Sequence, residues 1–233
     1  MSIRENIAEV IRQKDAFAGR SGKDGRDVLL IAVTKTRTPE EIREAISCGI
    51  TDIGENKVQE ILDKYDKVSV PVRWHLIGHL QTNKVKYIID KVYMIHSVDS
   101  LRLAQEIDKR AAAAGIIANI LIQVNAAGEE SKFGVAPEEV QSLLRAVLEE
   151  CEHIRIRGLM HIAPFADDPE EVRPYFTEVK RLYDQLSGIV HPRLDFSVLS
   201  MGMSNDFGVA IEEGANAVRV GTSIFGERDY STK

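Results

Sequence analysis

The sequence predicts a (β/α)8 barrel preceded by an N-terminal helix. Short β-branched segments alternate eight times with segments of helical periodicity. The strands, of which residues 29–33 are typical, are apolar on both faces, as parallel strands are when helices cover one side and packed side chains fill the other. The length of 233 residues suits one such barrel. An open, doubly wound sheet is the alternative, but no Gly-x-Gly-x-x-Gly pattern follows the first strand.

The elements are expected within one domain spanning residues 1–233. Residues 1–18 have apolar positions at helical spacing, residues 19–26 contain three glycines and no apolar side chain, and residues 28–228 form the barrel. We therefore expect a helix, a flexible connector and then the barrel. The predicted strands are residues 28–34, 52–54, 72–77, 92–96, 118–124, 154–160, 196–200 and 217–220. The predicted helices are residues 39–48, 57–65, 83–90, 100–114, 137–150, 169–187 and 205–213, with a last helical segment near Ile224.

Composition excludes several classes of function. The formal net charge of −6 argues against a nucleic-acid partner. No apolar run reaches the length of roughly 18 residues that a membrane span needs, and Glu5 and Glu9 are unlike a targeting peptide. Cys48 and Cys151 match no metal or disulfide spacing, and the histidines and carboxylates show no zinc pattern. We expect a cytoplasmic protein without a metal.

Lys35 stands at the end of the first predicted strand. Alternation places Ile31, Val33 and Lys35 on one face, which points into the barrel mouth if that face is the interior. The C-terminal ends of barrel strands carry the chemistry, and a lysine amine among apolar neighbours is a good imine-forming nucleophile. Lys35 is therefore a candidate Schiff-base lysine, and a solvated strand-end lysine is the plain alternative.

Two loops rich in Gly, Ser and Thr follow the seventh and eighth strands. The first runs from Ser200 through Gly202 and Ser204 into a helix, and the second contains Gly221 and Thr222. Barrel enzymes frequently bind phosphate between these two loops, so we expect an anion site there. The alternative is a helix cap and a turn. Arg219 points into the barrel and needs a ligand or an ion-pair partner there.

Polar side chains also end the second and third strands. Asn56 can hydrogen-bond a ligand ring oxygen or cap the following helix. His75 lies within an apolar strand, where a histidine is more often a hydrogen-bonded core residue than a ligand. His79 is a rim residue or an exposed one.

Five segments together resemble one known family. They are Ala32-Val33-Thr34-Lys35, Gly54-Glu55-Asn56, the run from His75 to Lys84, Ser200-Met201-Gly202-Met203-Ser204 and Val218-Arg219-Val220-Gly221-Thr222. In this order they are similar to the pyridoxal phosphate homeostasis protein family. The resemblance implies a fold-type III barrel, like the N-terminal domain of alanine racemase, that binds pyridoxal 5′-phosphate covalently.

The resemblance also implies a role for each matching residue. Lys35 would form the internal aldimine, and Arg219 would lie beside the pyridine nitrogen, where a permanent cation disfavours carbanion chemistry. Asn56 and His75 would line the ring pocket. In the loop after Asn125 the sequence departs from the family pattern, which leaves Glu130 and Lys132 without an assigned role. The phosphate would be surrounded by Ser200, Gly202, Ser204, Gly221 and Thr222.

The function that follows is binding, buffering and release of the cofactor rather than catalysis. A racemase needs a second acid or base, which the resembling racemases take from an additional β-domain, and about nine residues follow Ile224 here. We expect a monomer that makes transient contact with apo-enzymes dependent on pyridoxal phosphate. The alternatives are a minimal amino-acid racemase, with His79, His161 or water opposite Lys35, and a Schiff-base aldolase acting on a sugar phosphate.

Overall fold

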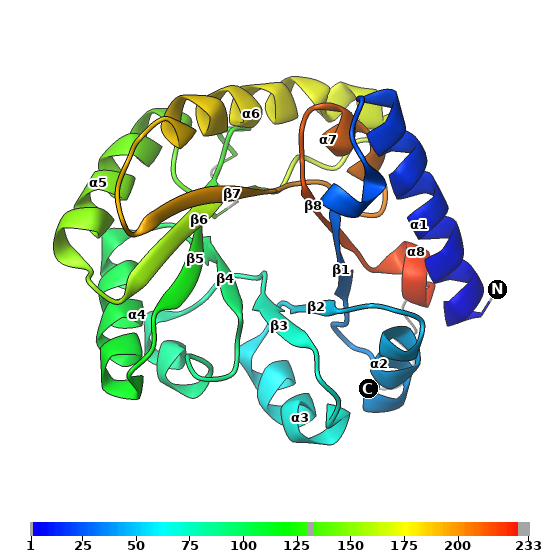
Figure 1. Ribbon diagram of the computed structural model, residues 1–233, viewed down its shortest axis with the longest axis horizontal. Helices are drawn as coiled ribbons and strands as arrows, with labels where there is room; N and C mark the ends of the chain where they lie inside the picture. Colours follow the sequence, from blue (N-terminus) through cyan, green and yellow to red (C-terminus); the bar gives the residue numbers. More distant parts are fainter. Residues whose placement is uncertain (1, 130–132, 228–233) are drawn as a thin grey trace.

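The computed structural model describes residues 2–129 and 133–227 and has the predicted barrel architecture (Figure 1). Its parallel strands pair in chain order, and β8 pairs with β1 to close the sheet. The (β/α)8 barrel is confirmed, and the doubly wound alternative is wrong because the sheet is closed by the pairing of β8 with β1, whereas an open sheet keeps two edge strands. The strands are β1 (Leu29–Val33), β2 (Asp52–Glu55), β3 (Arg73–Leu76), β4 (Met94–Val98), β5 (Ala118–Val124), β6 (Ile154–His161), β7 (Leu194–Ser200) and β8 (Ala217–Val220).

Helices surround the strands and agree closely with the expected ranges. The third crossover differs: instead of an α-helix over residues 83–90 it forms a 3₁₀ helix over Thr82–Tyr87. Val85 in this helix and Ile88, the residue directly after it, are both buried and are spaced by three residues. Other 3₁₀ turns cover Gly25–Asp27, Pro137–Glu139 and Pro169–Val172. The helices are α1 (Ile3–Arg20), α2 (Pro39–Ser47), α3 (Val58–Val68), α4 (Leu101–Ala114), α5 (Val140–Glu150), α6 (Arg173–Ser187), α7 (Phe207–Glu212) and α8 (Thr222–Phe225).

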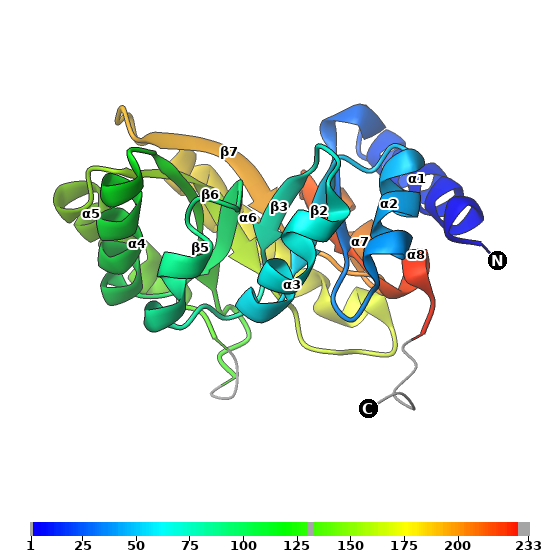
Figure 2. The same ribbon diagram turned by 90° about the horizontal axis from the view of Figure 1, so that it is seen from below.

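The N-terminal helix continues further than expected and packs beside α7 and α8 (Figures 1 and 2). The expectation of a flexible connector over residues 19–26 is wrong at its C-terminal end. Gly25 is buried and begins a 3₁₀ turn, and the buried Lys14 donates to its carbonyl. A Cβ at position 25 would lie 2.0 Å from Asp15 Oδ1, so the glycine permits this close packing.

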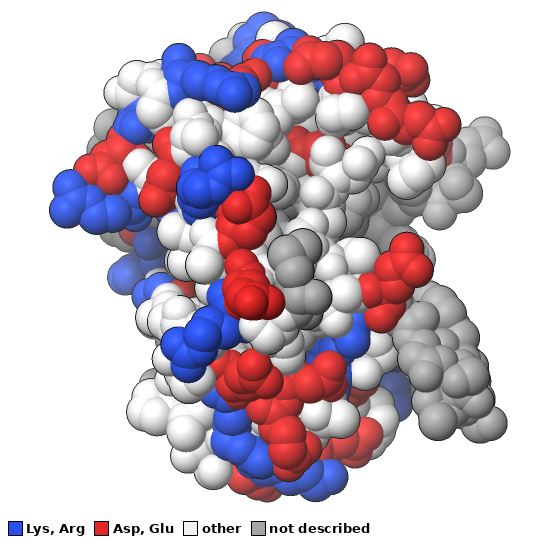
Figure 3. Space-filling view, turned by 90° about the vertical axis from the view of Figure 1, so that its right-hand side faces the viewer, with Lys and Arg blue, Asp and Glu red and all other residues white. Residues whose placement is uncertain are grey.

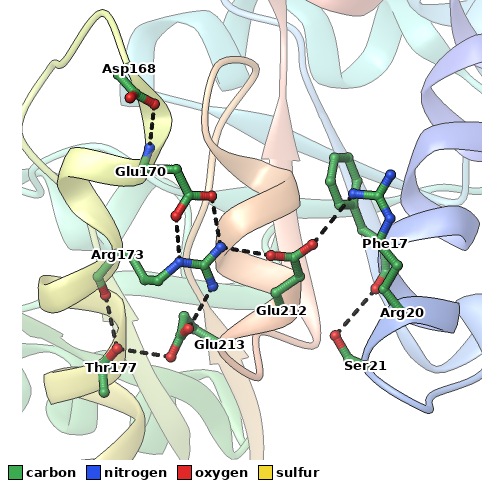
Figure 4. A network of polar contacts seen from close by, with 9 residues as sticks. All are labelled: Phe17, Arg20, Ser21, Asp168, Glu170, Arg173, Thr177, Glu212 and Glu213. Carbon is green, nitrogen blue, oxygen red and sulfur yellow. Dashed lines mark hydrogen bonds and ion pairs between the residues drawn. The ribbon is translucent and has the colours of Figure 1, made fainter.

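A partly exposed network of charges joins the helices near the N-terminal helix (Figure 4). Arg173 on α6 contacts Glu170, Glu212 and Glu213, each at 2.7 Å. Glu212 also lies 3.6 Å from Arg20 of α1. The network therefore links α6, the end of α7 and the end of α1.

The core has two layers. The larger apolar cluster lies between the strands and the helices. The smaller apolar cluster consists of Met94, Leu121 and Met160, which come from β4, β5 and β6. Several buried side chains are polar, and they belong to alternate positions of neighbouring strands, such as His75 on β3 and His96 on β4. The barrel interior is therefore partly polar, which the apolar appearance of the strands did not predict.

The face that carries α1 and its neighbours shows interspersed acidic and basic side chains (Figure 3). No extended basic patch is visible on this face, as expected from the net charge. Within the described ranges, no helix is long and apolar enough to span a membrane.

Candidate functional site

A cavity of about 360 Å³ opens at the C-terminal ends of β1 and β8. The loops after β1, β6, β7 and β8 supply its walls. Three of its side chains are cations, and none of the described residues that line it is a carboxylate. The cavity is therefore positively charged within an acidic protein. Its lining residues are Val33, Lys35, Arg37, Phe165, Met203, Ser204, Asn205, Arg219, Gly221 and Thr222.

The structure brings five of the predicted site residues together in this cavity and places four elsewhere. The five are Lys35, Ser204, Arg219, Gly221 and Thr222, which come from the ends of β1 and β8 and the loop after β7. The other four, Asn56, His75, Ser200 and Gly202, are not among the described residues that line it.

The backbone on both sides of Lys35 is held in place by hydrogen bonds from other residues. Thr36 has a φ of 65°, a left-handed conformation that a β-branched residue adopts only under constraint. Its N–H donates to Glu60 Oε2 at 2.6 Å, and Lys64 Nζ donates to the Thr34 carbonyl at 2.9 Å. Two side chains of α3 therefore fix the turn that carries Lys35.

The same two side chains belong to a buried ion cluster. Lys64 Nζ lies 2.8 Å from Glu60 Oε2 and 2.8 Å from Oε1 of Glu55, which is fully buried at the end of β2. Thr34 Oγ1 donates to Glu55 at 2.7 Å. Burial raises the pKa of Glu55, and the neighbouring Lys64 and Thr34 oppose that rise. We name Glu55, Glu60 and Lys64 the α3 ion cluster.

The two loops predicted to form an anion cup meet at Ser204. Ser204 Oγ accepts from the backbone N–H of Gly221 at 3.2 Å and of Ser223 at 3.4 Å. These N–H groups lead into α8 and point to one position, which the hydroxyl now occupies. A phosphate oxygen is a stronger acceptor for the same groups.

Gly202 allows the loop after β7 to pack closely against α7. Its φ is 93°, and a Cβ there would lie 2.6 Å from Ala210 Cβ and 2.9 Å from Phe207 Cα. The glycine therefore permits close packing against α7, which is a different role from the expected contact with phosphate.

Arg219 is 3% exposed and is held by neutral acceptors. Its Nη1 donates to Ser200 Oγ at 2.6 Å and its Nη2 to the His161 carbonyl at 2.8 Å. Burial lowers the pKa of Arg219 to about 10, and Asp206 opposes that change, so the guanidinium is still charged at neutral pH. The Ser200 hydroxyl thus contacts Arg219, not the cavity.

His75 and Asn56 differ from the expectation that both line the ring pocket. The fully buried His75 ring contacts Asp52 and His96, which is the core role considered for it from the sequence. Asn56 lines a neighbouring cavity of about 530 Å³ together with His79. Glu130 and Lys132 lie outside the described residues.

Several lining residues were not predicted. Arg37 follows Lys35 by two residues. Its guanidinium is held in place because it donates to the Gly226 carbonyl at 2.6 Å and lies 3.5 Å from the Glu41 carboxylate. Phe165 is 86% exposed and borders the opening beside Met203. The loop after β6 gave no motif from which Phe165 could have been found, whereas Asn205 directly follows the predicted Ser204.

Comparisons with known proteins identify the family and agree with the fold. The family model of the alanine racemase N-terminal domain matches residues 21–229. A protein of Aquifex aeolicus named pyridoxal phosphate homeostasis protein is 46% identical over 231 residues, covering 99% of this chain and 100% of its own length. One of the same name from Escherichia coli K12 is 38% identical over 237 residues, covering 99% of each. The structure of PipY from Synechococcus elongatus PCC7942, with PLP bound, has a TM-score of 0.83 at 34% identity and covers 97% of this chain and 100% of that one.

Proposed function

The chain belongs to the family of pyridoxal phosphate homeostasis proteins, and we propose that it binds, stores and releases pyridoxal 5′-phosphate in the cavity that contains Lys35. The observation that carries the proposal is the concentration of three cations and several hydrogen-bond donors in one cavity of an acidic protein. The cavity volume is within the range of small-ligand sites.

The lining residues fit the two ends of this cofactor. Ser204, Gly221 and Thr222 supply hydroxyl and backbone donors for a phosphate. Arg219 only donates, so it suits an unprotonated ring nitrogen. Bound pyridoxal 5′-phosphate supplies an aldehyde that reacts reversibly with an amine, and Lys35 is the lysine in the cavity.

Three of the four remaining predicted residues support the site less directly. Ser200 acts through its hydrogen bond to Arg219, and Gly202 acts by permitting the turn above α7. His75 reaches Arg219 through other side chains of the interior. Asn56 lines a different cavity from Lys35, so its predicted place beside the cofactor ring has no support from the cavity lining.

Storage and release are favoured over catalysis. None of the described residues lining the Lys35 cavity is a carboxylate, histidine, tyrosine or cysteine, so these residues offer no acid or base opposite Lys35. The relatives are named for homeostasis and not for a reaction. No observation favours the racemase or the aldolase.

We further propose that one domain, residues 1–233, acts as a monomer in the cytoplasm and passes the cofactor to apo-enzymes by transient contact. The closed barrel supports one folding unit. Cys48 and Cys151 are free thiols, as expected in a reducing compartment.

The first test is covalent labelling. Pyridoxal phosphate is added to the wild type, to Lys35→Ala and to the matched control Lys57→Ala, each is reduced with borohydride, and the labelled peptide is mapped. We expect the adduct and its absorbance band in the wild type and the control but not in Lys35→Ala. A label elsewhere, or no band in the wild type, contradicts the proposal.

A second test separates storage from catalysis. The loaded protein is mixed with an apo-enzyme that requires the cofactor, and recovery of that enzyme's activity is followed over time. In parallel, loss of the α-proton from amino acids is measured in deuterated water. We expect transfer of the cofactor and no proton exchange above that of the free cofactor, and faster exchange would favour the racemase.

A further inference from the structure

A chain of buried polar side chains crosses the barrel interior from β2 to β8. Asp52 Oδ1 lies 2.8 Å from His75 Nε2, and His75 Nδ1 lies 2.9 Å from His96 Nε2. His96 Nδ1 lies 3.1 Å from Ser200 Oγ, which accepts from Arg219 at 2.6 Å. All five side chains are buried, and the chain ends in the Lys35 cavity because Arg219 lines it.

The charge state of each member follows from its surroundings. Burial lowers the pKa of His75, and it lowers that of His96 well below the ordinary value, with His75 and Arg219 acting in the same direction. Both rings are therefore neutral at pH 7. Burial raises the pKa of Asp52, but hydrogen bonds from His75, Arg73 and Thr51 outweigh it and lower the pKa to about 2. This chain of hydrogen-bonded side chains thus joins the Asp52 carboxylate to the Arg219 guanidinium through neutral groups.

These charge states permit one arrangement of the protons. An ionised carboxylate only accepts, so His75 carries its proton on Nε2, and its Nδ1 is an acceptor. His96 must then donate from Nε2, which leaves its own Nδ1 as an acceptor. Ser200 donates to that nitrogen and accepts from Arg219 through its oxygen. Every hydrogen bond therefore points from Arg219 towards Asp52.

This arrangement determines how Arg219 is held. Among the described residues, the structure shows no ion pair between Arg219 and a carboxylate; its two recorded acceptors are the Ser200 hydroxyl and the His161 carbonyl. The carboxylate that completes the chain lies at the start of β2, where it also pairs with Arg73 at 2.6 Å. The guanidinium is thus oriented by neutral acceptors and keeps its charge for a ligand in the cavity.

We infer that Asp52, His75, His96 and Ser200 are positioning residues that hold Arg219 as an oriented cation in the Lys35 cavity through a fixed order of protons. The inference rests on the proposed function and extends it, since it explains how groups outside the cavity set its affinity for the cofactor. Loss of His96 removes the acceptor of the Ser200 hydroxyl proton, so the hydroxyl is free to turn away from Arg219.

The first arm of the test does not use the cofactor. Long-range ¹H–¹⁵N spectra of protein labelled at histidine report the tautomer of each ring, and the arginine side-chain signals report whether the Arg219 guanidinium is held. We expect His75 and His96 to be neutral and protonated at Nε2. We also expect resolved Arg219 signals that average out in His96→Leu and return in His96→Gln, which keeps a donor and an acceptor. A charged ring, an Nδ1 tautomer or an unchanged Arg219 signal would overturn the inference.

The second arm measures the dissociation constant for pyridoxal phosphate. We expect it to rise about tenfold in His96→Leu and to recover in His96→Gln. Asp52→Asn tests the same chain from its far end and is an alternative where His96→Leu does not fold. An unchanged constant in folded His96→Leu and Asp52→Asn contradicts the inference. Absence of binding by the wild type, with the expected spectra, would reject the proposed function and leave the positioning of Arg219 intact.

Discussion

The α3 ion cluster and the Arg173 network use the same kinds of side chain in opposite surroundings. The contact of Lys64 with Glu55 is 2.8 Å and that of Arg173 with Glu170 is 2.7 Å, so distance does not separate them. Exposure does: the Glu55 side chain is 0% exposed and that of Glu170 is 57%. Burial makes a charge costly to leave unpaired, whereas water and salt screen an exposed pair.

The two clusters also differ in what they hold. The α3 ion cluster contacts the backbone on either side of Lys35, through the Thr34 carbonyl and the Thr36 N–H. The Arg173 network joins side chains of α6, α7 and α1 (Figure 4). The difference indicates that buried charge in this fold shapes the functional turn, while exposed charge assists the packing of helices.

The largest expected effect comes from breaking the buried cluster. Lys64→Met leaves the Glu55 carboxylate buried without its cation, so we expect the free energy of unfolding to fall by about 3 to 5 kcal/mol. Urea unfolding at pH 7 measures it. The double variant Lys64→Met/Glu55→Gln removes the charge as well and is expected to recover more than half of the loss. A loss below about 1 kcal/mol in the single variant would mean that burial does not distinguish the two clusters.

The next effect depends on pH and concerns Asp52, which is also buried. Its pKa is lowered from 3.8 to about 2, so its ionised form stabilises the folded state. That contribution, about 2 kcal/mol, is complete above about pH 4 and is lost as the pH falls towards 2. We expect wild type and Asp52→Asn to differ in unfolding free energy at pH 5 and to converge near pH 2. A difference independent of pH would indicate a purely steric effect.

A smaller effect on stability, but a clear one on function, is expected at Thr36. Thr36→Gly relieves the left-handed strain and also loosens the unfolded chain, so the free energy of unfolding should change by less than about 1 kcal/mol. In this variant the turn that carries Lys35 is more flexible, so the Lys35 amine is less well oriented and the covalent adduct should form about tenfold more slowly. Stopped-flow absorbance measures the rate. Thr36→Asn is the control, because asparagine tolerates this conformation and should retain the wild-type rate.

The sequence was sufficient for the barrel and for most of its elements, although not for the 3₁₀ helix over Thr82–Tyr87 or the placement of Asn56. Alternation predicted that Lys35 and Arg219 point into the barrel, and the turn residues Ser204 and Gly221 predicted an anion cup; all four residues line one cavity. The sequence did not separate Ser200 from Ser204, since both are serines in one loop and their directions depend on how the chain turns at Gly202. The structure shows that one faces Arg219 and the other faces the N–H groups of Gly221 and Ser223.

The interior contacts were beyond the sequence for a different reason. His96 meets Ser200 across 104 positions, and Asp52 meets His75 across 23, so no local spacing indicates these pairs. Arg37 likewise gains its role from the Gly226 carbonyl, 189 positions away. The first contact joins β4 to β7 across the barrel, the second joins the neighbouring strands β2 and β3, and the third joins the loop after β1 to the end of α8.

The smallest expected effect comes from the exposed network. Arg173→Ala removes three contacts at once, but Arg173 and its partners are partly exposed, so we expect the free energy of unfolding to fall by only about 1 kcal/mol at low salt. Because the Debye length shrinks to about 3 Å at 1 M salt, the difference from wild type should decrease there. Chemical unfolding in urea with and without 1 M NaCl measures this, and Arg173→Lys, which keeps the charge, should lose less. Affinity for pyridoxal phosphate should not change in either variant. A loss as large as that of Lys64→Met, or one insensitive to salt, would show that this network acts as a buried cluster does despite its exposure.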